Sequence, residues 1–263
     1  MKRALKFGLA VLVLTGILAF KFLRTQEDSP LQTGFTGNTF ELKSTDGLMV
    51  KADVYESEGQ KGPIILLFHQ AGYSRGEYRP VAPRLKEMGF TCIAIDQRSG
   101  KEVNGVKNET FQQASKNGMG TDYLDAYPDL EAALIYAKNK YPSRKIILWG
   151  SSYSASLVFI LGTEYKNDVS GIVAFSPGEY FEYEGRQIKD YAKEVSCPVF
   201  ISSAKDEHHL WKEIFENVSN ADKVSYLPEG KGIHGSRALW EANEGHEVCW
   251  NAIGGFVNNI KSR

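Results

Sequence analysis

The sequence is poor in cysteine, with three residues in a chain of 263. They are Cys92, Cys197 and Cys249, and no two of them form a CxxC pair. An odd number and wide separation exclude a zinc knuckle and a dense disulfide framework. Because Cys92 and Cys197 adjoin predicted strands, we interpret them as buried free thiols.

The chain also lacks an excess of charge of either sign. Lys and Arg total 31, Asp and Glu total 32, and the formal net charge is -1. No long basic cluster occurs in the body of the sequence, so nucleic acid is not an expected partner. Neither GxGxxG nor a P-loop is present, which argues against a phosphate-cradling loop. The length suits one domain with a sizeable core.

Long uncharged apolar runs are confined to the beginning of the sequence. Residues 7–20 carry no charge, and three basic residues lie within residues 1–6. A basic start followed by an apolar core is the layout of an export signal. The run is shorter than the about 20 residues of a spanning helix, and no A-x-A-like cleavage site follows it.

This layout divides the chain into three expected parts. Residues 1–24 are predicted to be a signal peptide or an uncleaved signal-anchor helix, and residues 25–38 a linker. Residues 39–263 then form a single globular domain. We expect this domain outside the cytoplasm, either exported or anchored to the membrane through an uncleaved first segment.

Apolar runs typical of strands alternate with helical patterns after the linker. The alternation follows a predicted antiparallel hairpin and indicates an α/β fold, with a mostly parallel central sheet and helices on both faces. In such sheets ligands bind at the carboxyl ends of the strands. A polar stretch, residues 101–120, is predicted to be a surface loop. The predicted strands are 39–44, 48–55, 64–68, 90–95, 145–149, 171–175, 198–202 and 224–227, and the helices include 79–88, 122–140, 208–217 and 244–260.

Residues 145–157 combine a short strand, a turn of small residues and the start of an apolar helix. The turn reads GSSYS from Gly150, with Ser152 at its centre. This pattern is typical of a nucleophile elbow, G-x-S-x-G, which lifts the central Ser above the sheet and directs the helix N-terminus at the same point. Ser154 replaces the second Gly, and Ser-rich turns also arise as simple helix caps. The motif therefore depends on partners elsewhere in the chain.

A serine nucleophile needs a base and an acid to orient that base. Asp206 and His234 each come shortly after a predicted strand, at the same edge of the sheet as Ser152. The order Ser152, Asp206, His234 is the order of an α/β-hydrolase triad. Glu207 is the alternative acid, one residue later.

The remaining histidines are weaker candidates for the base. His208 and His209 adjoin the acid, and without a carboxylate cluster at ligand spacing they predict no metal site. His246 lies in the predicted last helix. His69 precedes the nucleophile and is interpreted as a turn-former, and residues 96–98 are interpreted as a charge cluster that fixes a loop.

The strand end at residues 69–72 is where a second oxyanion donor is expected. The predicted donors are the backbone N–H groups of Tyr153 and Ala71, with Gln70 as the alternate. Two N–H groups directed at one point stabilise the negative oxygen of a tetrahedral intermediate.

Taken as a set, these residues resemble the α/β-hydrolase superfamily, and within it the dienelactone-hydrolase-like serine esterases. Dienelactone hydrolases use Cys as the nucleophile, where this chain has Ser152. The resemblance covers roughly residues 40–260 and implies ester cleavage by acyl transfer on a small-molecule substrate, with no cofactor and no metal. It is carried by HQAG at His69, DQRSG at Asp96, GSSYS at Gly150, Asp206 after PVFISSAK, and His234 in GKGIHG.

Residues 176–196 form an insertion large enough to shape a pocket as a short lid. Tyr180, Phe181 and Tyr183 either line an apolar substrate site or pack the lid, and composition leaves both interpretations open. The same triad would serve a peptidase or a thioesterase. A catalytically silent, membrane-anchored binding protein is the alternative from another class, and the presence of all three triad positions argues against it.

Overall fold

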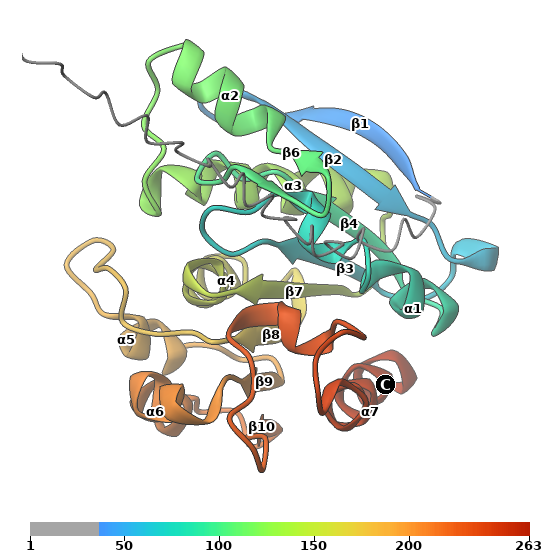
Figure 1. Ribbon diagram of the computed structural model, residues 1–263, viewed down its shortest axis with the longest axis vertical. Helices are drawn as coiled ribbons and strands as arrows, with labels where there is room; N and C mark the ends of the chain where they lie inside the picture. The colour runs from blue at the N-terminus through green and yellow to red at the C-terminus, as the bar shows by residue number, and fades with distance from the viewer. Residues whose placement is uncertain (1–36) are drawn as a thin grey trace, which may run out of the picture. The chain divides into compact units, whose positions relative to one another are not determined.

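An eight-stranded sheet runs through residues 37–263, the part of the chain that the computed structural model describes (Figure 1). The predicted export segment, residues 1–24, and nearly all of the predicted linker, residues 25–38, lie outside the described residues. Within residues 37–263, no helix combines the length and the apolarity that crossing a membrane would require.

The sheet has the order β1-β2-β4-β3-β7-β8-β9-β10. Strand β2 is antiparallel to both β1 and β4, and all other neighbours are parallel. The predicted hairpin and mostly parallel sheet are therefore confirmed. The strands are β1 (Asn38–Lys43), β2 (Met49–Tyr55), β3 (Ile64–Phe68), β4 (Thr91–Ile95), β7 (Ile146–Ser151), β8 (Val169–Phe175), β9 (Val199–Ser202) and β10 (Lys223–Tyr226).

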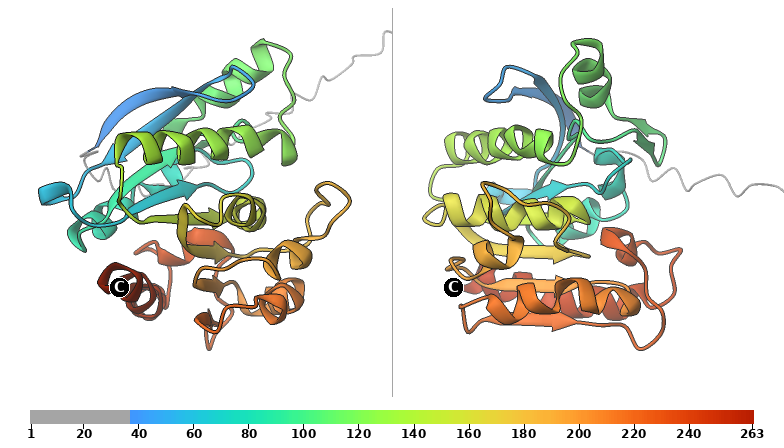
Figure 2. Two further views of the ribbon diagram at one scale, coloured as in Figure 1. Left: turned by 180° about the vertical axis from the view of Figure 1, so that it is seen from behind. Right: turned by 90° about the vertical axis from the view of Figure 1, so that its left-hand side faces the viewer.

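Helices cover both faces of the sheet, as predicted (Figure 2). One face packs against α1 (Ala82–Glu87) and α7 (His246–Ser262). The other packs against α3 (Tyr127–Lys140), α4 (Tyr153–Glu164), α5 (Ile188–Ala192) and α6 (His208–Asn217).

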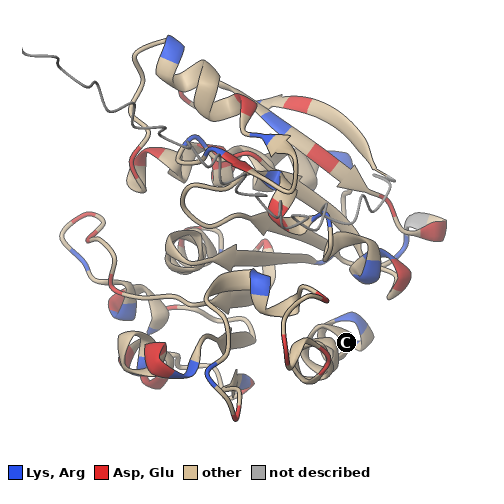
Figure 3. Ribbon diagram, viewed as in Figure 1, with Lys and Arg blue, Asp and Glu red and all other residues tan. Residues whose placement is uncertain are grey.

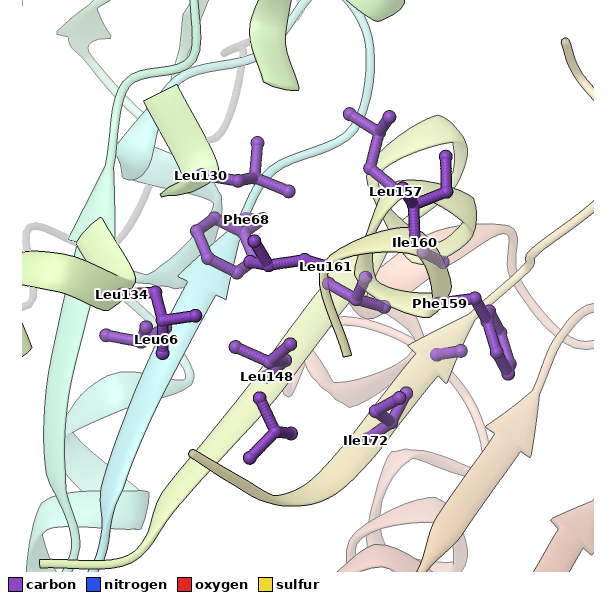
Figure 4. Close-up of a cluster of buried hydrophobic side chains, with 14 of the residues drawn as sticks. Leu66, Phe68, Leu130, Leu134, Leu148, Leu157, Phe159, Ile160, Leu161 and Ile172 are labelled. Carbon is purple, nitrogen blue, oxygen red and sulfur yellow. The ribbon is translucent and has the colours of Figure 1, made fainter. Parts of the chain in front are cut away.

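Strand β3 shows why the central strands read as continuous apolar runs. All five residues, IILLF, are buried, and successive side chains point to opposite faces. Leu66 and Phe68 pack toward α3 and α4, whereas Ile65 and Leu67 belong to the core under α1 and α7. Figure 4 shows the first of these layers, with side chains from three strands and two helices: Leu66, Phe68, Leu130, Leu134, Leu148, Leu157, Ile160, Leu161 and Ile172.

The prediction of a loop over residues 101–120 is wrong. This stretch forms a two-stranded sheet, β5 (Glu102–Val103) with β6 (Val106–Lys107), and the helix α2 (Glu109–Lys116). The side chain of Asn108 caps the helix by accepting a hydrogen bond from the Phe111 N–H at 2.7 Å. Capping and packing against β2 stabilise a helix of eight residues in which only Phe111 and Ala114 are apolar.

Basic and acidic residues are interspersed along the elements (Figure 3), and a few are buried as ion pairs. The guanidinium of Arg75 lies 2.6 Å from Asp96, and that of Arg98 lies 2.7 Å from Asp129 and 2.5 Å from Asp46. These pairs hold the chain that follows β4. The interpretation of residues 96–98 as a loop-fixing cluster is therefore confirmed.

Candidate active site

Ser152 occupies the sharp turn between β7 and α4. Its φ of 60° and ψ of -126° lie in a region that residues other than glycine rarely adopt. The turn is held by two backbone hydrogen bonds, from the Ser152 N–H to Phe175 at 2.7 Å and from the Ala155 N–H to Ser152 at 2.8 Å. A side chain at Gly150 would collide with the backbone of Ser154 and Ala155. The strand, turn and helix expected around a nucleophile elbow are all present.

The hydroxyl of Ser154 connects the elbow to the end of β3. Its Oγ accepts a hydrogen bond from the Ser151 N–H at 2.9 Å and lies 2.8 Å and 2.9 Å from the carbonyl oxygens of Phe68 and His69. A glycine at this position would leave these buried groups without that partner. The departure from the G-x-S-x-G pattern thus has a structural role, because Ser154 joins the elbow to the strand that precedes the predicted oxyanion loop.

His234 is held by a carboxylate from the neighbouring loop. Its Nδ1 lies 2.6 Å from Oε1 of Glu207, the last residue of the 3₁₀ helix η4 (Lys205–Glu207). Burial alone would raise the pKa of Glu207, but hydrogen bonds from His234 and Ser176 lower that pKa below its usual value. An ionised Glu207 accepts the Nδ1–H and leaves Nε2 as the basic nitrogen of the imidazole.

The prediction that Asp206 orients His234 is wrong. Asp206 is exposed, and within residues 37–263 its carboxylate forms no hydrogen bond or ion pair, while its backbone carbonyl oxygen lies 2.8 Å from Nδ1 of His209. After β9 the chain winds into η4, where each residue is rotated by about a third of a turn from the one before. Only one of two adjacent carboxylates can therefore face His234, and that residue is Glu207.

The sequence reasoning missed Ser176, which lies at the end of β8 with a φ of 56°. Its Oγ–H donates to Oε2 of Glu207 at 2.6 Å, and the same Oγ accepts the N–H of Gly235 at 2.9 Å. Ser176 thus binds both the carboxylate of the pair and the loop that carries His234. A single Ser after a strand has no distinctive pattern, and only its place at the carboxyl edge of the sheet could have indicated it.

The predicted oxyanion loop, residues 69–72, follows β3. The N–H of Gln70 donates to the Glu77 carboxylate at 2.7 Å, so the prediction of Gln70 as the alternate donor is wrong. The N–H of Ala71 has no acceptor within residues 37–263, and neither does that of Tyr153 at the first turn of α4. The two predicted donors are therefore both without a hydrogen-bond partner in this part of the chain.

His69 has the structural role predicted for it. The ring is fully buried, and burial lowers its pKa to about 4, which keeps the imidazole neutral. Its Nε2 accepts the N–H of Gln97 at 2.9 Å, and its Nδ1 lies 2.8 Å from the carbonyl oxygen of Gln70. Both ring nitrogens are occupied in fixing loops.

The aromatic residues of the predicted lid have different surroundings. The hydroxyl of Tyr180 donates to the carbonyl oxygen of Ser176 at 2.9 Å and contacts the hydroxyl of Ser152, and burial raises its pKa to about 12. The ring of Tyr183, in contrast, packs against Tyr127 with centroids 5.3 Å apart. Phe181 lies edge-on to the exposed ring of Tyr123 at 6.5 Å. Of the three predicted substrate contacts, only Tyr180 touches the candidate nucleophile.

Comparison with known proteins places the chain in a family. The family described as "Serine aminopeptidase, S33" (Hydrolase_4) matches residues 59–226, well over half of the sequence. The chain belongs to this family. The match includes β3, the elbow and β9, and ends at the last residue of β10, before the loop that carries His234.

Individual relatives are more distant. A monoacylglycerol lipase of Mycolicibacterium smegmatis is 25% identical over 183 residues, which is 70% of this chain and 58% of the lipase. The match thus spans little more than half the length of that relative. An esterase of Pyrococcus furiosus superposes with a TM-score of 0.65 at 17% identity, covering 86% of this chain and 92% of the esterase. A dienelactone hydrolase of Anabaena variabilis gives 0.64 at 14% identity, covering 86% and 95%. These structures establish the α/β-hydrolase fold.

Proposed function

We propose that the protein is a serine hydrolase that cleaves carboxylic esters by acyl transfer. Ser152 is the nucleophile, His234 the general base and Glu207 the residue that orients the base. The observation that carries the proposal is the 2.6 Å pair of His234 and Glu207 at the sheet edge where Ser152 is held in a strained turn. The relatives named as a lipase and as esterases support an ester as the substrate.

The reaction follows from the positions of the groups. Nε2 of His234 removes the proton of Ser152 as its oxygen attacks the carbonyl carbon, and ionised Glu207 stabilises the imidazolium that forms. The N–H groups of Ala71 and Tyr153 stabilise the oxyanion. His234 then donates its proton to the departing alcohol, and water activated by the same His234 releases the acid.

Two features support Ser152 over its neighbours as the nucleophile. The hydroxyls of Ser151 and Ser154 are fully buried and engaged, Ser151 with the Glu77 carboxylate and Ser154 with the end of β3. Ser152 remains 9% exposed and lies beside Tyr180 at the lid. It is the serine of the turn that a substrate can reach.

A peptidase acting through the same triad is the second candidate, because the matching family is described as a serine aminopeptidase. Ester and amide substrates differ in the leaving group, which must be protonated by His234 in both cases. Relative rates on matched esters, thioesters and aminoacyl amides therefore distinguish the two candidates and a thioesterase.

A fluorophosphonate probe tests the proposal. We expect the probe to label wild type at one site and to leave Ser152→Ala unlabelled, with the site located by peptide mass spectrometry. Ser154→Ala is the matched control, because its hydroxyl belongs to the same turn but faces β3. Absence of labelling in a protein that is folded by circular dichroism would refute the proposal, and so would labelling that persists in Ser152→Ala.

A further inference from the structure

A carboxylate that the proposed reaction does not use lies beneath the elbow. Glu77 belongs to the 3₁₀ helix η2 (Arg75–Tyr78) and is fully buried. No ion pair to it occurs within residues 37–263, although the guanidinium of Arg237 acts on it from a distance. Burial of a carboxylate without a paired cation is costly, and it raises the pKa of Glu77 to about 7. Hydrogen bonds alone hold this group.

The first hydrogen bond fixes the oxyanion loop. Oε2 of Glu77 accepts the N–H of Gln70 at 2.7 Å, which sets the plane of the peptide before Gln70. The carbonyl oxygen of Gln70 lies 2.8 Å from Nδ1 of His69 and accepts the Tyr73 N–H at 3.2 Å. In a trans peptide the next N–H points away from that carbonyl. The Ala71 N–H is thereby directed away from the buried groups.

The second hydrogen bond reaches the loop of the base. Oε1 of Glu77 accepts the hydroxyl of Ser151 at 2.7 Å, and that hydroxyl accepts the N–H of Ser236 at 2.9 Å. Ser151 directly precedes the nucleophile, and Ser236 follows the base by two residues. Between them Gly235 packs so closely that a Cβ would lie 2.6 Å from both the Ser151 hydroxyl and the Gln70 amide oxygen.

We propose that Glu77 is a positioning residue that holds the oxyanion loop and the His234 loop in register with Ser152. This inference rests on the proposed function of the site. Glu77 touches neither substrate nor reacting atoms. It acts through the Gln70 N–H on one side and through Ser151 on the other.

Steady-state kinetics with a transition-state analogue tests the role. Glu77→Leu replaces the carboxylate with an apolar side chain of similar size and so removes both hydrogen-bond acceptors. We expect kcat to fall about 10–100-fold with KM within about twofold, because the displaced Ala71 N–H stabilises mainly the transition state. The affinity for a trifluoromethyl ketone, whose adduct carries an oxyanion, should fall by a similar factor. Glu77→Gln should retain kcat within about fivefold, because its amide oxygen still accepts the Gln70 N–H.

Ser151→Ala tests the connection of Glu77 to the His234 loop separately from its connection to the oxyanion loop. It keeps the bond from Gln70 to Glu77 and breaks the link to Ser236, and we expect kcat to fall about 2–10-fold. Thr91→Val removes a buried hydroxyl at the start of β4, at the other end of the strands from the candidate site. It is the control for a loss of stability alone. It should leave the ketone affinity unchanged.

The outcomes are distinguishable. Folded Glu77→Leu with wild-type kcat and ketone affinity overturns the positioning role, and so does a Glu77→Gln variant that is as impaired as Glu77→Leu. If Glu77→Leu does not fold, Ser151→Ala decides, and unchanged kcat and ketone affinity in that variant overturn the proposal. Wild type that neither reacts with fluorophosphonate nor hydrolyses esters contradicts the proposed function itself.

Discussion

The carboxylate of Glu207 accepts the Nδ1–H of His234 at 2.6 Å, whereas Asp206, one residue earlier, is exposed. This relationship predicts opposite results for two adjacent substitutions. Glu207→Gln should lower kcat by about 10³–10⁴-fold, because the amide no longer stabilises the imidazolium and favours the wrong tautomer. Asp206→Asn should change kcat by no more than about twofold, as expected of a surface position.

Both variants are measured with one ester under saturating conditions. Each variant should also be titrated with the fluorophosphonate probe, since slower labelling of Glu207→Gln would show that the nucleophile itself is less activated. A large loss of kcat in Asp206→Asn, with activity kept in Glu207→Gln, would restore Asp206 as the acid.

Loss of the Ser176 hydroxyl should lower activity less than loss of the Glu207 carboxylate. Ser176→Ala removes the hydroxyl that donates to Glu207 at 2.6 Å and accepts from Gly235 at 2.9 Å. A hydrogen bond to a charged group contributes about 1.5–3 kcal/mol, so kcat/KM should fall about 10–100-fold. Thr91→Val loses comparable buried hydrogen bonds far from the site and should keep its kcat/KM. Equal kcat/KM values for the two variants would show that Ser176 is not needed to orient Glu207.

Removing the Ser154 hydroxyl should destabilise the protein. Ser154→Ala leaves the buried Ser151 N–H and the carbonyl oxygens at the end of β3 without the hydroxyl between them. We expect the free energy of unfolding in urea to fall by about 1–3 kcal/mol. Ser262→Ala, at an exposed hydroxyl near the end of α7, should change it by less than about 0.5 kcal/mol. If Ser154→Ala matches wild type in stability, the connection between elbow and β3 contributes nothing.

The raised pKa of Glu77 should make the free energy of unfolding depend on pH. Its pKa rises from the usual 4.5 to about 7 on burial, so between these values the folded protein binds a proton that the unfolded chain has released. Stability attributable to Glu77 therefore falls as the pH rises through this interval, by at most about 3 kcal/mol. Glu77→Gln should lack this contribution.

The measurement is urea unfolding of both proteins at pH 5 and pH 8. Other buried carboxyls with raised pKa values, Asp96 and Asp129, are common to both proteins and cancel in the comparison. Parallel pH curves for wild type and Glu77→Gln would mean that Glu77 has the same pKa in the folded and unfolded chains.

The fold was predictable because apolar runs and apolar periodicity mark most of its strands and helices. The buried strand at Ile64–Phe68 and the helix at His208–Asn217 have the bounds that the apolar pattern predicts. Helix α2 was missed because its stability comes from the Asn108 cap and from packing on β2, where Thr110 accepts the N–H of Lys51 at 2.9 Å. A helix cap and a single hydrogen bond to another element do not change the apolar pattern from which a helix is predicted.

The residues that the structure brings together at the candidate site differ from the predicted set by one residue at the acid position. Strand ends place Ser152 and His234, whereas the choice between Asp206 and Glu207 depends on the rotation of a short 3₁₀ helix that strand counting does not resolve. Ser176 contacts Glu207, 31 residues away, and Glu77 contacts Ser151, 74 residues away. Such residues have no motif and are found only once the sheet order is known.

The site is assembled from strand ends that are neighbours in space and far apart in the chain, and this affects synthesis. Ser152 precedes His234 by 82 residues. At typical elongation rates of 5–20 residues per second, about 4–16 s separate the appearance of Ser152 from that of His234, the base proposed for it. Throughout that interval the nascent chain carries a serine that nothing can deprotonate. Hydrolytic activity would therefore begin only once about nine-tenths of the chain has been made, so that fragments ending before His234 would be inert.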